Sequence, residues 1–567
     1  MADFEDRHDS PTSALLGEER SNKHARHGGS FVIEDDGHTY SYSYGPPGVS
    51  GLLQNKVALA CAGYVAIGGF TFGYDQGVIA NVLVMPDFLG RWGEITAWEK
   101  GSMTAVLELG ALFGALAAGV LADRYSRRYA ICFSCIVFVI GSLFQCAAQS
   151  FSHLFIGRAI GGFGVGALSM LCPLYMAEIS PPEIRGSLMA LEQYAIVLGV
   201  IVGFWLGYFT RAIPGAASWR IPLGAQVLPG VFLAVGSLLL PPSPRFLVGK
   251  GRYDEALKSL AWLRFHKLPF SEACEESLLQ VELMEMRVEA TLTERAFELD
   301  SVQSGHSIEK DGLLVRELKD YKRLFLPAYR DRTMIGILIM VFQQWSGINA
   351  LLYYGPTLVQ SIGLSGDKVS LLASGGIGIV QAIAVFPTIM YIDQWGRKPL
   401  LRYGSIVMTA SHFLVSLIVW RFQDNWPLHP TAAWTAVGCI YIFTAAYGIS
   451  FGPVAWVLPS EVFPLSMRSK GVALSTASNW FNNFFIGLIT PMLMEVSPAT
   501  TFMIFSTACF MAYLWSTYRV PETANASLEE IDAVFRSSAG QETQALKEQI
   551  EQELGLTQLI LSLRGDI

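Results

Sequence analysis

Twelve apolar segments constrain what this 567-residue chain can fold into more than any other feature. The hydrocarbon core of a bilayer, about 30 Å thick, is crossed by roughly 20 apolar residues in a helix. The segments that are long and apolar enough are residues 57–83, 103–122, 129–148, 152–177, 188–210, 221–240, 332–357, 369–392, 401–421, 434–459, 472–495 and 500–518. Only 16% of the residues are charged, whereas soluble domains contain about 25%. We therefore predict an all-α membrane protein with twelve transmembrane helices.

Polar stretches divide these segments into two groups of six. Residues 244–330 are rich in Glu, Lys and Arg with helical periodicity, which predicts a soluble helical linker with a break near Ser301–Ser307. The predicted organisation is a disordered N-terminal tail (1–55), a six-helix bundle (56–243), the linker (244–330), a second six-helix bundle (331–520) and a C-terminal tail (521–567).

The loop charges predict the orientation in the membrane. Basic residues are concentrated in the loops after the second, fourth, eighth and tenth segments, and the loop between the third and fourth segments has none. Because cytoplasmic loops carry an excess of Lys and Arg, we expect both tails and the linker to be cytoplasmic.

One apolar segment carries polar groups where a membrane helix normally has none. Residues 333–357 include Gln343, Gln344, Asn349, Tyr353 and Tyr354. Such groups are costly in hydrocarbon and normally face a protein interior or a watery cavity. On a straight helix Asn349 lies nearly opposite Gln343, so we expect Gly347 to break the helix and turn both amides toward one cavity. Uncharged amides beside aromatic rings suit a polyhydroxylated solute; polar packing between helices is the alternative.

The two groups of six segments repeat each other. Residues 123–128 (DRYSRR) follow the second segment and residues 393–398 (DQWGRK) follow the eighth. Equivalent places after the fourth and tenth segments hold Glu178 with Arg185 and Glu461 with Arg468. Two charge motifs at equivalent points of two halves predict an internal duplication, and hence two pseudo-symmetric bundles. The alternative is that the basic residues only enforce topology.

With these motifs the chain resembles the sugar porter family of the major facilitator superfamily, close to fungal monosaccharide transporters. The resemblance covers about residues 57–535. It rests on residues 123–128, 173–186, 242–245, 343–349 and 521–523. It implies two six-helix bundles that rock around a central site, exposing it alternately to each side of the membrane.

The resemblance implies substrate-binding roles on several helices. Gln343, Gln344 and Asn349, with Tyr353 beside them, contact sugar hydroxyls. In segment 434–459 two helix breaks are predicted, one within residues 447–453 and one at Pro459. The resemblance implies that Tyr447 and Trp456 line the cavity, where an indole stacks on a sugar ring. The other positions that bind or orient substrate are Gln193, Gln381 and Asn483, while Asn479 is equally well interpreted as a helix-packing amide.

Two charged residues inside the membrane predict proton coupling. A carboxylate that alternately gains and loses a guanidinium partner changes its affinity for a proton. Bacterial symporters of the family have an acid at the position of Asp75 and an arginine like Arg158, whereas animal uniporters have Asn. Some yeast facilitators also have the acid, and Gln226 stands where bacterial symporters have a second acid, so uniport stays open. Glu108 and Glu192 are interpreted as structural acids, with substitute proton sites as the alternative.

Charged residues at the cytoplasmic helix ends are predicted to form a latch across the inner mouth. Such pairs favour the outward-open state and break when the inner mouth opens. The latch residues are Arg127, Arg128, Glu178 and Arg185 in the first half, and Arg397, Glu461 and Arg468 in the second.

The predicted function is import of a small neutral monosaccharide, a hexose or pentose, across the plasma membrane, with a proton as coupling ion and no other cofactor. The functional unit is expected to be a monomer in the lipid bilayer. Alternatives are a facilitated uniporter, a carrier of a polyol, disaccharide or sugar acid such as quinate, and a non-transporting sugar sensor. No metal cluster, phosphate loop or activated nucleophile supports an enzyme, and the net charge of −8 gives no indication of nucleic-acid binding.

Overall fold

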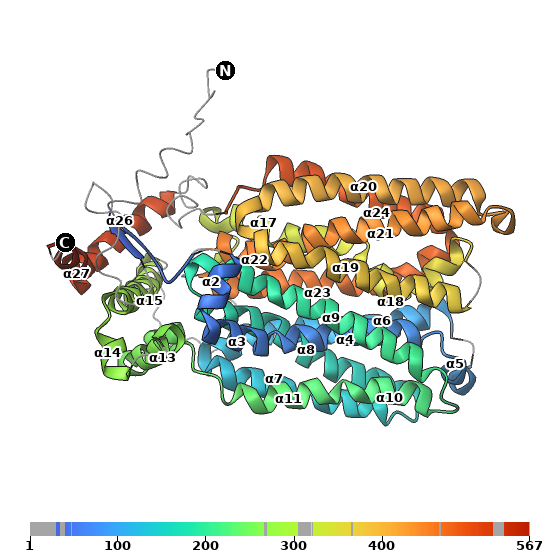
Figure 1. Ribbon diagram of the computed structural model, residues 1–567, viewed down its shortest axis with the longest axis horizontal. Coiled ribbons are helices and arrows are strands. Elements are labelled where there is room, and N and C mark those ends of the chain that lie inside the picture. Colours follow the sequence, from blue (N-terminus) through green and yellow to red (C-terminus); the bar gives the residue numbers. More distant parts are fainter. Residues whose placement is uncertain are drawn as a thin grey trace, which may run out of the picture.

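The computed structural model describes residues 30–33, 40–46, 48–93, 95–265, 269–303, 319, 321–364, 367–463, 467–524 and 538–565. Within these ranges the chain is almost entirely helical, and the long helices run side by side in one body (Figure 1).

The first half forms six spans. Two of them consist of two consecutive helices each, α3 with α4 and α10 with α11. The helices are α3 (Lys56–Val65), α4 (Ile67–Val82), α6 (Ala97–Arg124), α7 (Arg127–Cys146), α8 (Phe151–Ile179), α9 (Arg185–Thr210), α10 (Ala217–Ala225) and α11 (Val227–Ser237). Short helices α2 (Val49–Gln54) and α5 (Pro86–Trp92) and the 3-10 turn η1 (Pro182–Ile184) lie at their ends.

The second half forms six further spans, of which the first and the fourth are broken. The helices are α17 (Pro327–Trp345), α18 (Ile348–Ser361), α19 (Asp367–Trp395), α20 (Arg397–Phe422), α21 (Pro430–Ile449), α22 (Phe451–Val462), α23 (Arg468–Val496) and α24 (Pro498–Tyr518), with the 3-10 turn η2 (Trp426–Leu428). In Figure 1 they lie above the helices of the first half, and the halves meet where α6 packs on α23 and α9 packs on α19.

The prediction of twelve transmembrane helices is confirmed. In the described part of the chain, eleven spans are long and apolar enough to cross a bilayer. The twelfth, α23, has 29 residues and a length of about 43 Å. It is more polar because it carries Asn479, Asn482 and Asn483, which turn toward neighbouring helices.

Glycines allow the helices of the first half to approach closely. A Cβ at Gly110 or Gly114 of α6 would lie 2.3 and 2.1 Å from backbone oxygens of α8, and one at Gly162 or Gly166 of α8 would lie 2.1 and 2.0 Å from those of α6. Such contacts between small residues are the usual basis of helix packing in membranes.

The predicted break at Gly347 is confirmed. This glycine separates α17 from α18 in the left-handed conformation, with φ of 92°. A second break, at Ser450, separates α21 from α22. The second break predicted in that span is wrong at Pro459, because α22 continues through this proline to Val462.

Replacing Gly347 with valine is expected to destabilise the protein strongly. A Cβ at this position would lie 2.6 Å from the Phe505 ring, and a β-branched residue is strained at positive φ. We expect a loss of about 2–4 kcal/mol, seen as a lower melting temperature of the detergent-solubilised protein. Gly438→Val is the control, because a Cβ at Gly438 meets no atom within 4 Å. Equal melting temperatures for the two variants would contradict a structural need for glycine at 347.

The described part of the linker forms a helical layer at one end of the spans (Figure 1). Its helices are α12 (Pro244–Gly249), α13 (Tyr253–Phe265), α14 (Phe270–Glu275) and α15 (Ser277–Gln303). Arg264 joins this layer to the first half, because it pairs with Glu282 of α15 at 2.8 Å and donates to the Ile179 carbonyl of α8 at 2.8 Å. The predicted break near Ser301–Ser307 falls partly outside the described residues, and α15 runs to Gln303.

The predicted disorder of residues 1–55 is wrong for the described part of that tail. Strands β1 (Ser30–Ile33) and β2 (Tyr40–Ser43) pair antiparallel, and α2 follows them. The hydroxyls of Tyr40 and Tyr42 donate to Glu285 of α15, at 2.7 and 2.6 Å. The alternation of tyrosines, which places these rings on one face, is the physical reason that this polar segment docks. From the C-terminal tail, α26 (Ser538–Leu554) and α27 (Leu556–Gly565) also pack on α15.

Candidate substrate and proton sites

A small cavity lies between the two halves, at the centre of the helical body. Its volume is about 20 Å³, and it is lined by Phe72, Gln76, Gln193, Ile196, Val197, Val200, Gln343, Gln344, Ile348, Asn349, Leu352, Gln381, Tyr447 and Trp456. Seven of the nine residues predicted to bind substrate are among them. The lining contains no charged side chain, so the cavity offers amides, one phenol and one indole on an apolar background.

A chain of amides follows the broken helix α17–α18. Asn349 donates to Gln344 at 2.6 Å and to Asn483 of α23 at 2.9 Å. Gln344 donates to Asn479 at 3.1 Å, and Asn479 donates to the side-chain oxygen of Gln343 at 2.5 Å. Gln343 then donates to the Phe451 carbonyl at the break between α21 and α22, at 3.1 Å. The two broken spans are therefore connected through hydrogen bonds of the residues predicted to hold the substrate.

The other two predicted substrate residues, Tyr353 and Asn483, lie behind the cavity wall. The Tyr353 hydroxyl donates to Glu108 of α6 at 2.7 Å, and Asn483 donates to the other oxygen of Glu108 at 2.9 Å. Gln76 of α4 donates to Tyr353 at 3.1 Å and to Asn349 at 3.2 Å. Both predicted residues therefore contact the cavity only through neighbours.

Three residues of this network are not among the nine predicted to bind substrate: Gln76, Glu108 and Asn479. Gln76 directly follows Asp75, so it was within a segment already singled out. Asn479 lies one helical turn before Asn483 on α23 and on the same face. The sequence signal that could have identified these residues is a polar side chain in an apolar helix. Only the packing of the two halves against each other shows which partner each side chain contacts.

The remaining predicted residues that line the cavity come from three other spans. Gln193 comes from α9 and Gln381 from α19, while Tyr447 and Trp456 flank the break at Ser450. In the described structure the side-chain oxygen of Gln381 is buried without a hydrogen-bond partner. An acceptor aimed at a cavity in this way is available to a hydroxyl of a bound solute.

The cavity is closed to a sugar in this conformation. A volume of about 20 Å³ holds about one water molecule, and ligand pockets are typically several hundred Å³.

Asp75 and Arg158 lie next to each other, as predicted. A carboxylate oxygen of Asp75 on α4 is 3.5 Å from a guanidinium nitrogen of Arg158 on α8, and both side chains are buried. Arg158 also donates through Nε to the Met103 carbonyl at 2.7 Å. The second oxygen of Asp75 and one terminal nitrogen of Arg158 have no partner in the described structure.

The predicted duplication is visible in two equivalent ion pairs at helix ends. Arg127, at the start of α7, pairs with Glu178 near the end of α8 at 2.7 Å. Arg397, at the start of α20, pairs with Glu461 near the end of α22 at 2.6 Å. Each arginine also donates to the carbonyl of the residue five positions before it.

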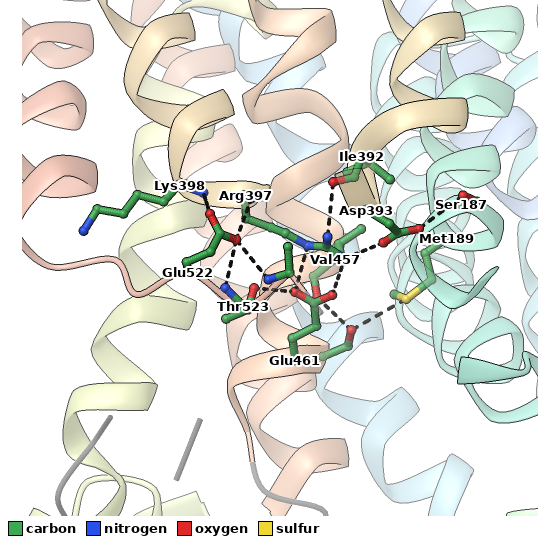
Figure 2. Close-up of polar contacts among 12 residues, drawn as sticks. Ser187, Met189, Ile392, Asp393, Arg397, Lys398, Val457, Glu461, Glu522 and Thr523 are labelled. Atoms are coloured by element: carbon green, nitrogen blue, oxygen red, sulfur yellow. Dashed lines mark hydrogen bonds and ion pairs between the residues drawn. The ribbon is translucent and has the colours of Figure 1, made fainter. Parts of the chain in front are cut away.

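Figure 2 shows how the second of these pairs is embedded. Arg397 also contacts Asp393 at 2.8 Å, and Asp393 accepts from Ser187 of the first half at 3.3 Å. The carboxylate of Glu522 accepts from the backbone N–H groups of Arg397 and Lys398 at the start of α20. The cluster therefore joins the two halves and the segment that follows α24.

Three residues of the predicted latch lie outside these pairs. Arg128 contacts the neighbouring Tyr129, with 3.1 Å to its hydroxyl. Arg185 and Arg468 have no side-chain hydrogen bond or ion pair within the described ranges, and both face a cavity of about 160 Å³ beside α15. The latch prediction is wrong for these three in this conformation. For Arg185 and Arg468 the reason lies in the linker layer. There the nearby carboxylate of Glu289 forms an ion pair with Arg245 of α12, at 2.7 Å.

Replacing Arg397 with alanine is expected to open the inner mouth, because Glu461 is left buried without its cation. A cysteine at Ser187, in a background without other reactive cysteines, reports the opening through labelling by an impermeant maleimide in inside-out vesicles. We expect labelling to be at least ~10-fold faster than in the parent. Arg402→Ala is the control, because Arg402 lies on the same helix and contacts the Tyr403 ring. Unchanged labelling of the Arg397 variant would contradict a latch at this position.

The comparisons with known proteins agree with this geometry. A family model described as "Sugar (and other) transporter" matches residues 61–535. The MFS glucose transporter mfs1 of Aspergillus flavus is 30% identical, over 84% of this chain and 89% of that protein. The high glucose sensor RGT2 of Saccharomyces cerevisiae is 31% identical, over 90% of this chain and 67% of that protein.

The fold has a solved counterpart. The structure of the proton:xylose symporter XylE bound to 6-bromo-6-deoxy-D-glucose superposes with a TM-score of 0.69 at 24% identity, and the match covers 85% of this chain and all of that chain. The two bundles of the present chain therefore have the major facilitator fold. Since the family model spans most of its length, this chain belongs to the sugar porter family of the major facilitator superfamily.

Proposed function

We propose that this protein imports a monosaccharide, a hexose or pentose, by alternating access and in symport with a proton. The observation that carries the proposal is the central cavity, which offers several amides, a phenol and an indole and no charge. Amides both donate and accept, so they match the hydroxyl groups of a neutral sugar, while Trp456 supplies a flat face for its ring. A glucose transporter among the relatives supports a substrate the size of a hexose or pentose.

The absence of charge in the described lining favours a neutral sugar over a sugar acid such as quinate. A carboxylate substrate needs a cation to compensate its desolvation. Arg158 is the nearest candidate, and it is held by Asp75 and the Met103 carbonyl.

Proton coupling is supported by the contact of Asp75 with Arg158. The carboxylate takes up a proton when the arginine moves away and releases it when the pair re-forms, and neither charge has another ionic partner in the described structure. In this proposal the proton is the coupling ion, and no further cofactor takes part.

Alternating access is supported by the closed centre and the paired cytoplasmic contacts. The cavity lies where the broken spans α17–α18 and α21–α22 face the first half, so bending at Gly347 and Ser450 changes the access to it. In the proposed arrangement the linker and both tails are cytoplasmic, the protein lies in the plasma membrane, and one chain is the functional unit.

Uptake of a panel of labelled monosaccharides tests the proposal, in cells that lack their own sugar transporters. We expect at least one hexose or pentose to accumulate above its external concentration, and a protonophore to abolish that accumulation. Equilibration that the protonophore leaves unchanged would support a uniporter instead. The relative RGT2 makes a sensor the alternative class, and an expressed protein that moves no member of the panel would support it.

A further inference from the structure

Glu108 is a buried acid placed between the two halves. It lies in the middle of α6, is only 1% exposed, and accepts hydrogen bonds from two residues of the second half, Tyr353 and Asn483. The described structure places no Lys or Arg at ion-pair distance from its carboxylate. A carboxylate with no ionic partner at this depth is costly, so it is expected to serve a function.

The hydrogen bonds around Glu108 depend on its protonation state. The Tyr353 oxygen accepts from Gln76 at 3.1 Å and from Asn483 at 2.8 Å, so its own hydrogen is directed to Glu108. Asn483 donates to the other carboxylate oxygen. Both oxygens therefore face donors, which suits an ionised carboxylate. A proton that lies along either of these hydrogen bonds sets one donor against another, so we expect Tyr353 or Asn483 to turn away.

This rearrangement reaches the residues proposed to bind the sugar. Asn483 accepts from Asn349, and Asn349 donates to Gln344, which lines the cavity. Gln76, which donates to both Tyr353 and Asn349, also lines it. The protonation of Glu108 thus decides how the donors and acceptors along the cavity wall are directed.

The titratable and charged groups near Glu108 come from three elements. Arg158 of α8 and Asp75 of α4 act on it electrostatically, and Tyr353 and Tyr354 of α18 lie beside it. The residue of α23 that contacts it, Asn483, is neutral. The positive charge of Arg158 therefore acts on both carboxyl groups, Glu108 and Asp75.

We propose that Glu108 is a second proton-binding residue, and that its protonation releases Tyr353 or Asn483 from α6 and re-directs the sugar-binding amides. The proton comes from water that enters between the halves when they open, and it returns to water on the same side, so Glu108 adds no net proton movement to transport. This inference rests on the proposed transport of a sugar, but it does not depend on Asp75 being the coupling residue.

The test uses sugar counterflow in proteoliposomes, which requires binding and exchange but no net proton movement. We compare the half-saturating sugar concentration between pH 5.5 and 8.5 in Asp75→Asn and in the double variant Asp75→Asn/Glu108→Gln. The single variant is expected to keep a pH dependence of about threefold to tenfold, and the double variant to lose it. Asp75→Asn/Glu192→Gln is the matched control, because Glu192 is equally buried and makes no described hydrogen bond across the interface.

Two results would overturn the inference. One is a pH-independent half-saturating concentration in Asp75→Asn, and the other is the same pH dependence with and without Glu108→Gln. If the glutamine variant does not fold, Glu108→Asp replaces it. A proton-binding role then predicts a shifted pH midpoint, whereas an unshifted midpoint contradicts it. Absence of counterflow in the parent protein would instead reject the proposed transport.

Discussion

Replacing Asp75 with asparagine is expected to reduce sugar accumulation to about the equilibrium level while exchange of labelled sugar continues. One pH unit supplies about 1.36 kcal/mol per proton, which sustains a roughly tenfold accumulation ratio at one proton per sugar. Asparagine cannot carry the proton, although it retains a similar shape beside Arg158, 3.5 Å away in the native pair. The ratio in proteoliposomes with an imposed gradient should therefore fall from about 10 to about 1.

The control for this experiment is Asp87→Asn, on the short helix α5 outside the spans. It should accumulate sugar as the parent protein does. Uphill accumulation by the Asp75 variant at the parental ratio would contradict the assignment of Asp75 as the coupling residue, even if the protein proves to be a symporter.

Replacing Asn349 with leucine is expected to weaken sugar binding by about 10–100-fold, because Asn349 connects three other residues of the site. It donates to Gln344 and Asn483 and accepts from Gln76. Leucine has a similar volume but no polar atoms, so the sugar loses a hydrogen-bonding partner and the three neighbouring amides lose the residue that orients them. The expected loss of binding free energy is about 1–3 kcal/mol in total. The measurement is the half-saturating sugar concentration in counterflow.

Asn482→Leu is the matched control, because Asn482 lies on α23 and bonds to Trp345 and Ser478 away from the cavity. It should change the half-saturating concentration by less than about threefold. A similar loss in both variants would indicate general destabilisation, and no loss in the Asn349 variant would contradict its place in the sugar site.

Much of the fold follows from local features of the sequence. The length of the apolar segments predicts the twelve spans, and the repeated charge motifs predict the duplication. In the structure these motifs form the equivalent ion pairs Arg127–Glu178 and Arg397–Glu461. The break at Gly347 was predictable because a straight helix cannot direct Gln343 and Asn349 to one cavity. The amides of the site were recognisable because they are costly in hydrocarbon unless they are satisfied.

What the sequence could not supply are contacts between residues far apart in the chain. Glu108 and Tyr353 are 245 positions apart, and only the docking of the two halves brings them together. The same limit explains why the latch prediction failed for Arg185 and Arg468. The linker layer, which is distant in the sequence, lies beside these two arginines. Residues 40–43 were predicted to be disordered because their partner, α15, lies some 240 positions later in the chain.

The central claim is that a neutral sugar and a proton cross together through the amide-lined centre. Proton entry into proteoliposomes, followed with a trapped pH-sensitive dye after addition of the transported monosaccharide, tests it most directly. The account predicts sugar-dependent acidification of the lumen at about one proton per sugar. This acidification should be lost in Asp75→Asn and should need a sugar concentration about 10–100-fold higher in Asn349→Leu. Labelled sugar entering the parent proteoliposomes without any sugar-dependent proton movement would contradict it.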